Sequence, residues 1–313
     1  MKETEMKIRK CGTMEVYNRQ VENFPEFRRA QATIENDILN LLERKTISQI
    51  TKPVKIHVVV HIVYNNENEN ISESQVISQI AVLNQDYSAT NADLPKVPEV
   101  WSELVADPMI SFELAEVGPD GIPGNGITRT QTSNTSFGTD DSVKFDDQGG
   151  KSAWPTEKYL NIWVCTIGGG ILGYAQFPGG PAETDGVVID FQCFGTEGTA
   201  VDPFNLGRTA THEVGHYLNL SHTFGEGRGN TCSDSDYVED TPNQLAPNYQ
   251  KPVFPKVSCN NGPNGDMFMN YMDYVDDDTM FMFTIGQKER MQATLLGPRA
   301  SLIAGQLNEN SNV

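Results

Sequence analysis

The sequence has no long hydrophobic run. No stretch approaches the roughly 18 apolar residues that are needed to span a bilayer, so no transmembrane helix is predicted. The N-terminal stretch from Met1 to Lys10 is highly charged and lacks the apolar core of a secretory signal. Because a signal is removed from mature secreted proteins, its absence does not assign the chain to the cytoplasm.

Basic residues are scarce. The chain has 23 Lys and Arg against 42 Asp and Glu, for a net charge of −19. This balance excludes a nucleic-acid-binding protein, which needs a basic face. Residues 53–313 hold 13 basic and 34 acidic residues (−21), whereas residues 1–52 hold 10 and 8 (+2). The acidity of the longer part has two interpretations, solubility and a preference for basic substrates, and composition does not choose between them.

Cysteine and histidine are few, with five of each. An odd number of cysteines in a secreted protein leaves one thiol to be explained. Three of the histidines fall in one short window, residues 212–222, whereas His57 and His61 lie on one face of a predicted strand and are expected to be structural. The cysteines are Cys11, Cys165, Cys193, Cys232 and Cys259.

The hydrophobic pattern predicts an α/β lobe. Apolar residues at helical spacing predict a helical segment over residues 12–50, and the β-branched run over 54–64 predicts a buried strand. Ser72 and Gln75 predict a capping box at the start of another helix. Residues 118–150, rich in Gly, Asp, Ser and Thr, are predicted to be a long surface loop. Further strands are predicted over 110–114, 159–166 and 186–191, with a sheet-edge segment within 168–178.

The segment from His212 to His222 carries the chemistry. His212 and His216 are four residues apart, so on a helix they project from one face and are able to share a metal ion. Zinc prefers imidazole nitrogen, and a catalytic zinc site keeps one position open for water. The metal lowers the pKa of that water from 15.7 towards roughly 7, and Glu213 is close enough to the first ligand to take the proton.

His222 lies six residues beyond His216, too far round a continuous helix to share its face. The chain must therefore turn sharply between the two. Asn219 stands where that turn is needed, and Asn is the non-glycine residue most tolerant of a left-handed backbone. We expect the helix to end at Asn219 and His222 to return as the third zinc ligand.

The pattern His-Glu-x-x-His-x-x-Asn-x-x-His resembles the extended zinc motif of the metzincin peptidases, which usually have Gly at the position of Asn219. Asn at that position is similar to some members of the pappalysin group. The resemblance runs from about His57 to the C-terminal helix, and it includes Gly173-Tyr-Ala-Gln-Phe-Pro178, Cys232, Asp240-Thr-Pro242, Cys259 and Asn270-Tyr-Met-Asp-Tyr274.

This resemblance implies an α/β fold in two parts. Residues 1–52 are expected to be a helical pro-segment, and residues 53–313 a two-lobed metzincin-like catalytic domain. The upper lobe would hold a mixed, twisted, mostly parallel sheet and the active-site helix. The lower lobe would be irregular and end in a helix that begins at about Thr284.

The resemblance also implies roles for single residues. Met272 would form the Met-turn, an apolar floor beneath the metal, and Tyr274 would help to bind the oxyanion of the tetrahedral intermediate. Cys232 and Cys259 match a disulfide of the family, while the state of Cys165 and Cys193 stays open.

A calcium site is implied in the acidic segment that follows. Calcium favours carboxylate, hydroxyl and carbonyl oxygens, and the resemblance points to Asp236, Val238 and Thr241 as its ligands. The alternative is a solvated acidic loop without a bound ion.

Cys11, in Arg9-Lys-Cys-Gly-Thr13, resembles the cysteine switch of metzincin zymogens. In such zymogens a thiolate takes the open zinc position, and thiolate is a good zinc ligand. The protein is then expected to stay latent until the leader is cut. Arg44, Lys45 and Lys52 are basic candidates for the junction.

Asp276-Asp-Asp278 follows the Met-turn directly. Pappalysin-like enzymes place an aspartate near this point and favour arginine on the primed side of the cut. Asp278 matches best by its spacing from Met272, so it is the predicted specificity residue, and a solvated turn is the alternative. A carboxylate there would form a bidentate pair with a guanidinium that Lys matches less well.

Together these features predict a secreted zinc endopeptidase made as a latent zymogen. Its partner would be a peptide or protein substrate, extended along the edge Gly173–Pro178 as an added strand, with no nucleic-acid or membrane partner. Glu213 would serve as base and then pass the proton to the leaving amine. Two alternatives remain: a zinc amidase acting on a non-peptide substrate, and a secreted binding protein with structural zinc.

Overall fold

The longest strand, β1 (Val54–Tyr64), organises a six-stranded sheet. The computed structural model describes residues 8–44, 50–225 and 231–306. All pairings in the sheet are parallel except the last, in which the edge strand is antiparallel to its neighbour. The predicted mixed, mostly parallel sheet is therefore confirmed. The order is β2 (Ile110–Leu114), β1, β4 (Tyr159–Cys165), β6 (Val187–Asp190) and β5 (Gly173–Ala175), with β3 (Ile127–Gln131) also paired to β1.

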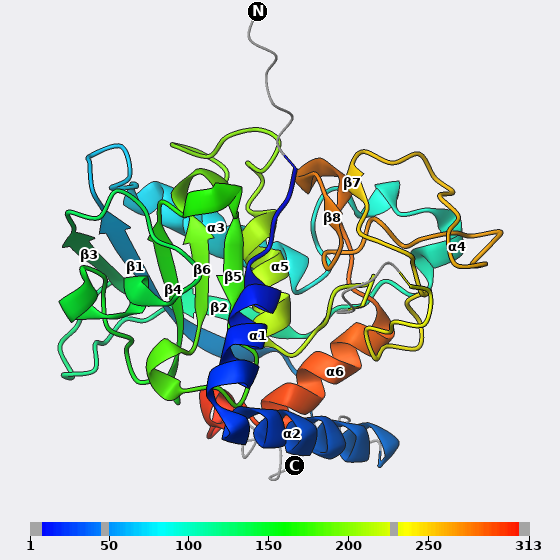
Figure 1. Cartoon of the computed structure of the whole chain (residues 1–313), viewed down its shortest axis with the longest axis horizontal. Helices are drawn as coiled ribbons and strands as arrows, with labels where there is room; N and C mark the ends of the chain where they lie inside the picture. The colour runs from blue at the N-terminus through cyan, green and yellow to red at the C-terminus, as the bar shows by residue number, and fades with distance from the viewer. Residues whose placement is uncertain (1–7, 45–49, 226–230, 307–313) are drawn as a thin grey trace, which may run out of the picture.

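The two faces of the sheet pack against different layers. Successive side chains of a strand point to opposite faces, so Ile56, Val58 and Val60 join the main core, whereas Val63 joins a smaller cluster around Trp163. The helices α3 (Glu73–Asp86) and α5 (Arg208–Tyr217) contact each other and this sheet on the main-core side. The active-site helix is thus held between α3 and the sheet edge (Figure 1).

The N-terminal leader forms two helices rather than one. α1 (Thr13–Asn23) and α2 (Pro25–Glu43) confirm the predicted helical segment but are separated at Phe24, because Pro25 begins the second helix. α1 lies against the edge strand β5, and α2 lies beside α6 (Ile285–Leu296), as Figure 1 shows in blue and orange-red. Lys45 falls outside the described residues.

The prediction that residues 118–150 form one long loop is wrong, because this segment contains the strand β3. This strand pairs with Val60–Tyr64, the half of β1 that lies beyond β2. Its residues, Ile-Thr-Arg-Thr-Gln, are half-buried or exposed. They lack the alternation of apolar and polar side chains that would have predicted a strand. The strand forms because the backbone of β1 offers hydrogen-bond partners at this position.

The predicted capping box at Ser72 is only half formed. The Ser72 Oγ accepts the Gln75 backbone N–H at 3.1 Å, but the Gln75 amide donates to the carbonyls of Phe191 and Phe194 rather than back to Ser72. A complete capping box occurs at the predicted C-terminal helix, where Thr284 and Gln287 cap α6 reciprocally.

The region after α5 is mostly irregular. Its regular elements are the short pair β7 (Tyr249–Gln250) and β8 (Tyr274–Val275), followed by α6. Among the described residues, no helix is both long and apolar enough to cross a membrane. The short helices in the described part of the chain are α4 (Glu99–Ser102), η2 (Leu94–Lys96), η3 (Ser142–Lys144), η4 (Asp146–Gln148), η5 (Gly168–Gly170), η6 (Ala182–Thr184), η7 (Phe191–Cys193), η8 (Asp277–Thr279) and η9 (Ala300–Ile303).

Candidate active site

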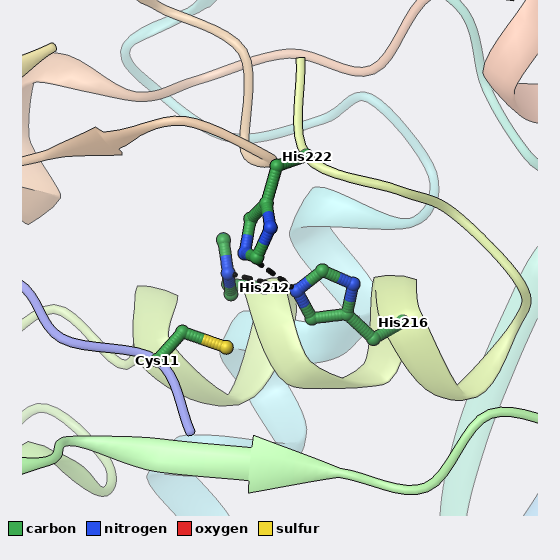
Figure 2. A group of neighbouring side chains, drawn as sticks. All are labelled: Cys11, His212, His216 and His222. Atoms are coloured by element: carbon green, nitrogen blue, oxygen red, sulfur yellow. Dashed lines mark hydrogen bonds between the residues drawn. The ribbon is translucent and has the colours of Figure 1, made fainter. Parts of the chain in front are cut away.

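The three predicted zinc ligands converge on one point. His212 and His216 project from α5, which ends at Tyr217. Asn219 then adopts the predicted left-handed conformation, with φ of 69°, and the Leu220 N–H returns to the Gly215 carbonyl at 2.9 Å. This turn brings His222 back, so that the Nε2 of His216 lies 3.1 Å from that of His212 and 3.0 Å from that of His222 (Figure 2).

The chemistry of these nitrogens fits a metal ion. The Nδ1 atoms of His212 and His216 lie 2.7 Å from the carbonyls of Tyr271 and Leu220. A carbonyl only accepts, so Nδ1 carries the proton and Nε2 presents a lone pair. Converging lone pairs repel one another unless a cation lies between them. Nitrogens at 2.0–2.1 Å from a tetrahedral zinc lie about 3.3 Å apart, close to the spacing seen.

The imidazoles are held in their neutral, metal-binding form. Burial lowers the pKa of His216 to about 4. Burial, and next the neighbouring His216, lower the pKa of His212 and His222 well below the usual range of histidine. Zinc therefore need not displace a proton from these nitrogens near neutral pH.

Met272, the predicted Met-turn residue, packs against α5. Its side chain is fully buried beneath α5, and a Cβ built on Gly215 would come within 2.5 Å of its sulfur. Glycine at position 215 is what allows the turn to approach the helix this closely. Met267, Met269, Met280 and Met282 are also buried, but they belong to the core at large.

Glu213 lies beside the histidines and is almost fully buried. Burial raises the pKa of this carboxyl to about 7, and hydrogen bonds from the leader partly offset that effect. The Thr13 hydroxyl donates to its Oε2 at 2.8 Å, and the Cys11 thiol lies 3.4 Å from the same oxygen. The carboxylate is thus engaged by the leader.

Cys11 completes the metal-ligand cluster. Its sulfur and the nitrogens of His212, His216 and His222 all lie within 4.8 Å of one another, and Figure 2 shows the thiol directed at the three rings from the leader strand. No sequence spacing predicts this contact, because Cys11 lies 202 positions before Glu213 of α5. The cysteine-switch resemblance was the signal that identified it.

The leader reaches the site by pairing with the sheet edge. Cys11 bridges Gly173 of β5 in parallel. The Gly12 N–H donates to the Gly173 carbonyl at 2.8 Å, and the Leu172 N–H donates to the Lys10 carbonyl at 2.9 Å. The edge predicted to receive a substrate strand is therefore occupied by the leader itself.

Tyr274 is close to the metal ligands. Its ring centroid lies 4.9 Å from that of His222 and 5.8 Å from that of His212. Burial, and next the neighbouring Cys11 and Glu213, raise the pKa of its phenol, so the hydroxyl stays protonated and is able to donate.

The aspartates at 277 and 278 point in different directions. The Asp278 side chain is 43% exposed and pairs with Lys251 on the surface. Its neighbour Asp277 is fully buried and accepts from Arg9 of the leader at 2.6 Å. The two side chains diverge because they lie in the tight turn η8, and spacing from Met272 does not indicate which of them points inward.

Arg9 fills a pocket that sequence analysis missed. Its guanidinium also donates to the Val275 carbonyl and the Thr209 hydroxyl, each at 3.1 Å, and lies 5.0 Å from the Phe204 ring centroid. Arg9 is two residues before Cys11, so in an extended segment both side chains face the same way. That spacing was the one available signal.

The predicted disulfide, Cys232–Cys259, is present. Cys165 and Cys193 are buried thiols rather than half-cystines, which answers the question that the sequence left open.

The predicted calcium ligands lie together. Asp236 accepts the Val238 N–H at 3.1 Å and the Thr241 hydroxyl at 2.7 Å, and that hydroxyl lies 2.9 Å from the Val238 carbonyl. Burial raises the pKa of Asp236 to about 7. A buried carboxylate with these neighbours has the oxygen chemistry that a calcium ion needs.

Several known proteins are similar to this chain. A family model described as pregnancy-associated plasma protein-A matches residues 144–296. An extracellular metalloprotease of Coccidioides posadasii is 30% identical over 280 residues, covering 86% of this chain and 85% of that protein. The chain belongs to the pappalysin family of metallopeptidases. A second relative, from Arthroderma gypseum, is 32% identical over 79% of this chain and 74% of that protein.

Solved structures similar to this pappalysin cover most of the chain. A promirolysin variant from Tannerella forsythia is 44% identical with a TM-score of 0.87, covering 96% of this chain and 99% of that one. Mature mirolysin in complex with a cleaved peptide is 48% identical with a TM-score of 0.79, covering 84% of this chain and 100% of that one. The metzincin fold is confirmed, and this pappalysin is a zinc-dependent metalloendopeptidase.

Proposed function

We propose that this pappalysin is a secreted endopeptidase, made as a latent zymogen, that hydrolyses peptide bonds with Glu213 as its general base. The observation that carries the proposal is the convergence of three neutral imidazoles beside a buried carboxylate. When bound by these imidazoles, zinc supplies a Lewis acid that lowers the pKa of water and polarises a carbonyl. The names of the extracellular relatives support secretion.

Glu213 and Tyr274 have complementary tasks. Glu213, whose pKa burial raises in the leader-covered form, would accept a proton from water and return it to the leaving amine once the leader is gone. The Tyr274 phenol keeps its proton and donates a hydrogen bond to the oxyanion that develops on the scissile carbonyl.

Latency follows from the position of the leader, which we take as residues 1–52. Its backbone covers the sheet edge, its Cys11 thiol faces the zinc ligands, and Thr13 engages Glu213. Mature mirolysin matches 84% of this chain and promirolysin 96%, a difference that supports an N-terminal pro-segment.

Substrate preference follows from Asp277. The Asp277 carboxylate is buried and oriented by the backbone N–H groups of Leu206 and Arg208, at 2.8 and 3.3 Å. Arg9 occupies its pocket as the side chain of a substrate would. We therefore propose that the enzyme favours Arg, and less strongly Lys, directly after the scissile bond, and that Asp277 rather than Asp278 selects it.

Calcium at Asp236, Val238 and Thr241 remains part of the proposal as a structural ion. It would neutralise a buried carboxylate in the irregular region that the disulfide closes.

Family membership favours peptide hydrolysis over the two alternatives. A binding protein with structural zinc needs no base, yet Glu213 is present, and the fourth donor, Cys11, comes from the leader. A digest of casein or gelatin separates a peptidase from an amidase of non-peptide substrates.

Two variants test the mechanism. Glu213→Ala should abolish peptide hydrolysis while the protein keeps about one zinc per chain, because the three imidazoles remain. His216→Ala should lose both zinc and activity. Zinc is measured by mass spectrometry and hydrolysis by cleavage of casein after leader removal. Full activity in purified Glu213→Ala would overturn the proposed base.

A further inference from the structure

Arg290 of α6 is a buried cation whose ion-pair partner belongs to the leader. Its Nη atoms donate to both carboxylate oxygens of Glu35 in α2, at 2.9 and 2.5 Å. Its Nε donates to the Asn219 carbonyl at 2.8 Å, and the Tyr237 ring centroid lies 5.6 Å from the guanidinium. Arg290 is only 2% exposed. The guanidinium is therefore held in place by the turn that precedes His222.

Removal of the leader takes away this carboxylate. Because Nε stays anchored to Asn219, the two Nη atoms keep their direction and lose their acceptors. A guanidinium left without its counter-charge in a recessed position is costly. The active enzyme therefore presents a fixed, bidentate donor that binds a carboxylate well.

A cavity surrounds this donor. With the leader in place the cavity has a volume of about 310 Å³, and leader residues, among them Tyr17 and Glu35, form one of its walls. Its catalytic-domain wall, which we call the Arg290 pocket, consists of Phe177, Asn219, Ser221, Tyr237 and Arg290. The Asn219 Nδ2 is buried and has no hydrogen-bond partner among the described residues. The residue that anchors the guanidinium through its carbonyl thus also carries an amide donor without a partner.

The Arg290 pocket lies along the path of the leader. From Cys11 the leader follows β5, where the Ala175 N–H donates to the Thr13 hydroxyl at 2.8 Å, and Tyr17 then packs on Phe177. The Phe177 ring in turn contacts His216, with centroids 5.5 Å apart. Arg9 lies before Cys11 and the Arg290 pocket beyond it, so the zinc ligands separate the two pockets.

We propose that the Arg290 pocket is a substrate subsite that binds an acidic side chain, Glu or Asp, on the side of the scissile bond opposite to the Asp277 pocket. This inference rests on the proposed function, in which Arg after the scissile bond enters the Asp277 pocket. Residues that precede the cut then extend past Ala175 towards Phe177. The leader's Glu35 occupies in the zymogen the position that a substrate carboxylate takes in the active enzyme.

Matched peptides test the subsite in the full chain after its activation. The parent peptide carries Arg directly after the scissile bond and Gln at every preceding position, and each variant peptide has one Gln replaced by Glu. At one position Glu should raise kcat/KM by about tenfold over Gln, the size expected of a charge-assisted hydrogen bond. Equal rates for Glu and Gln at every position would overturn the inference.

Two enzyme variants test whether the preference for Glu over Gln depends on the Arg290 pocket. The quantity compared is the ratio of kcat/KM for the Glu peptide to that for the Gln peptide, because a general loss of activity cancels in this ratio. Arg290→Gln should bring the ratio to about one, and an unchanged ratio in this variant would also overturn the inference. Asn219→Gly keeps the left-handed turn that Gly adopts freely but lacks the amide, and it should lower the ratio about threefold. If Arg290→Gln does not fold, the inference is tested by Asn219→Gly alone, and a Glu-to-Gln ratio equal to that of wild type in this variant would overturn it.

Failure of the proposed function is distinguished by the parent peptide. Its cleavage by wild type and its survival with Glu213→Ala test the base and the peptidase activity, whatever the Glu-to-Gln ratio is.

Discussion

At the scale of single residues, Asp277 and Asp278 form a matched pair in which only one carboxylate is buried. Asp277→Asn keeps the shape of the side chain but removes its charge. The variant should lose the preference for Arg after the scissile bond, lowering kcat/KM for such peptides by about tenfold or more, because it removes a buried charge-assisted pair. The measurement is a peptide library digested by the activated protein.

Asp278→Asn is the control for this prediction. Its carboxylate is exposed and pairs with Lys251, so the preference for Arg should stay within about twofold of wild type, as expected for a surface ion pair. A larger loss of preference in Asp278→Asn than in Asp277→Asn would reverse the assignment of the two residues.

His61 predicts a pH effect on stability. It is fully buried on β1, with its Nδ1 2.8 Å from the Thr128 hydroxyl and its Nε2 2.9 Å from the side-chain Oδ1 of Asn161. Burial lowers its pKa to about 4. The folded pKa thus lies below the unfolded value of about 6.5. The contribution of neutral His61, about 3 kcal/mol, is present above about pH 6.5 and is lost as the pH falls towards 4.

Denaturant unfolding of wild type and His61→Gln at a series of pH values checks this prediction. The difference in unfolding free energy between the two proteins should shrink as the pH falls, because Gln does not titrate. Comparing the two proteins cancels the contribution of the acidic groups. A difference that stays constant from about pH 7 to pH 4 would contradict the lowered pKa.

At the scale of elements, the acidic loop that follows α5 is expected to be ordered by calcium. Binding to the folded state adds RT ln(1 + [L]/Kd) to stability, so the melting temperature should rise with calcium concentration. Asp236→Asn should abolish that rise, because it removes the central carboxylate of the proposed site.

Glu239→Gln is the matched control, since Glu239 lies exposed in the same loop, and its calcium response should equal that of wild type. Zinc content should change little in either variant, because the three imidazoles lie outside this loop. If the melting temperature of wild type does not change with calcium concentration, the proposed calcium site is contradicted.

At the scale of the whole molecule, the leader and the catalytic domain form one latent unit. Ion pairs join them at Arg9–Asp277, Arg19–Asp141 and Glu35–Arg290. Among the described residues, Cys11 supplies the one thiol in the cluster of predicted zinc ligands. Cys11→Ala should therefore process itself faster than wild type, as followed by gel electrophoresis and peptide hydrolysis over time.

Once the leader has been removed, both proteins should have the same kcat/KM, because Cys11 has left with it. Equal activation rates for wild type and Cys11→Ala would assign latency to the covered sheet edge alone. The position of the cut is constrained by Ile50, which packs in the main core. A cut at Arg44 would keep this side chain in the mature enzyme, whereas a cut after Lys52, the boundary proposed above, would remove it, and N-terminal sequencing of the mature enzyme tells the two apart.

Features that depend on neighbouring residues were predictable from the sequence. The spacing of His212, Glu213 and His216 needs only helical geometry, and the tolerance of Asn219 for a positive φ needs only its own side chain. The β-branched run of β1 likewise indicated a buried strand. In each case the physical cause lies within a few residues of the effect.

Features that depend on distant partners were decided by the tertiary structure alone. β3 forms because half of β1 is not paired with β2. The Gln75 side chain does not complete the capping box because it donates to the carbonyls of Phe191 and Phe194. The sequence alone determined which residues are able to bind zinc and supply a base. Only the fold decided that Asp277 points inward, that Arg9 fills its pocket and that Glu35 meets Arg290, because burial and charge pairing between distant segments arise only when the chain has packed.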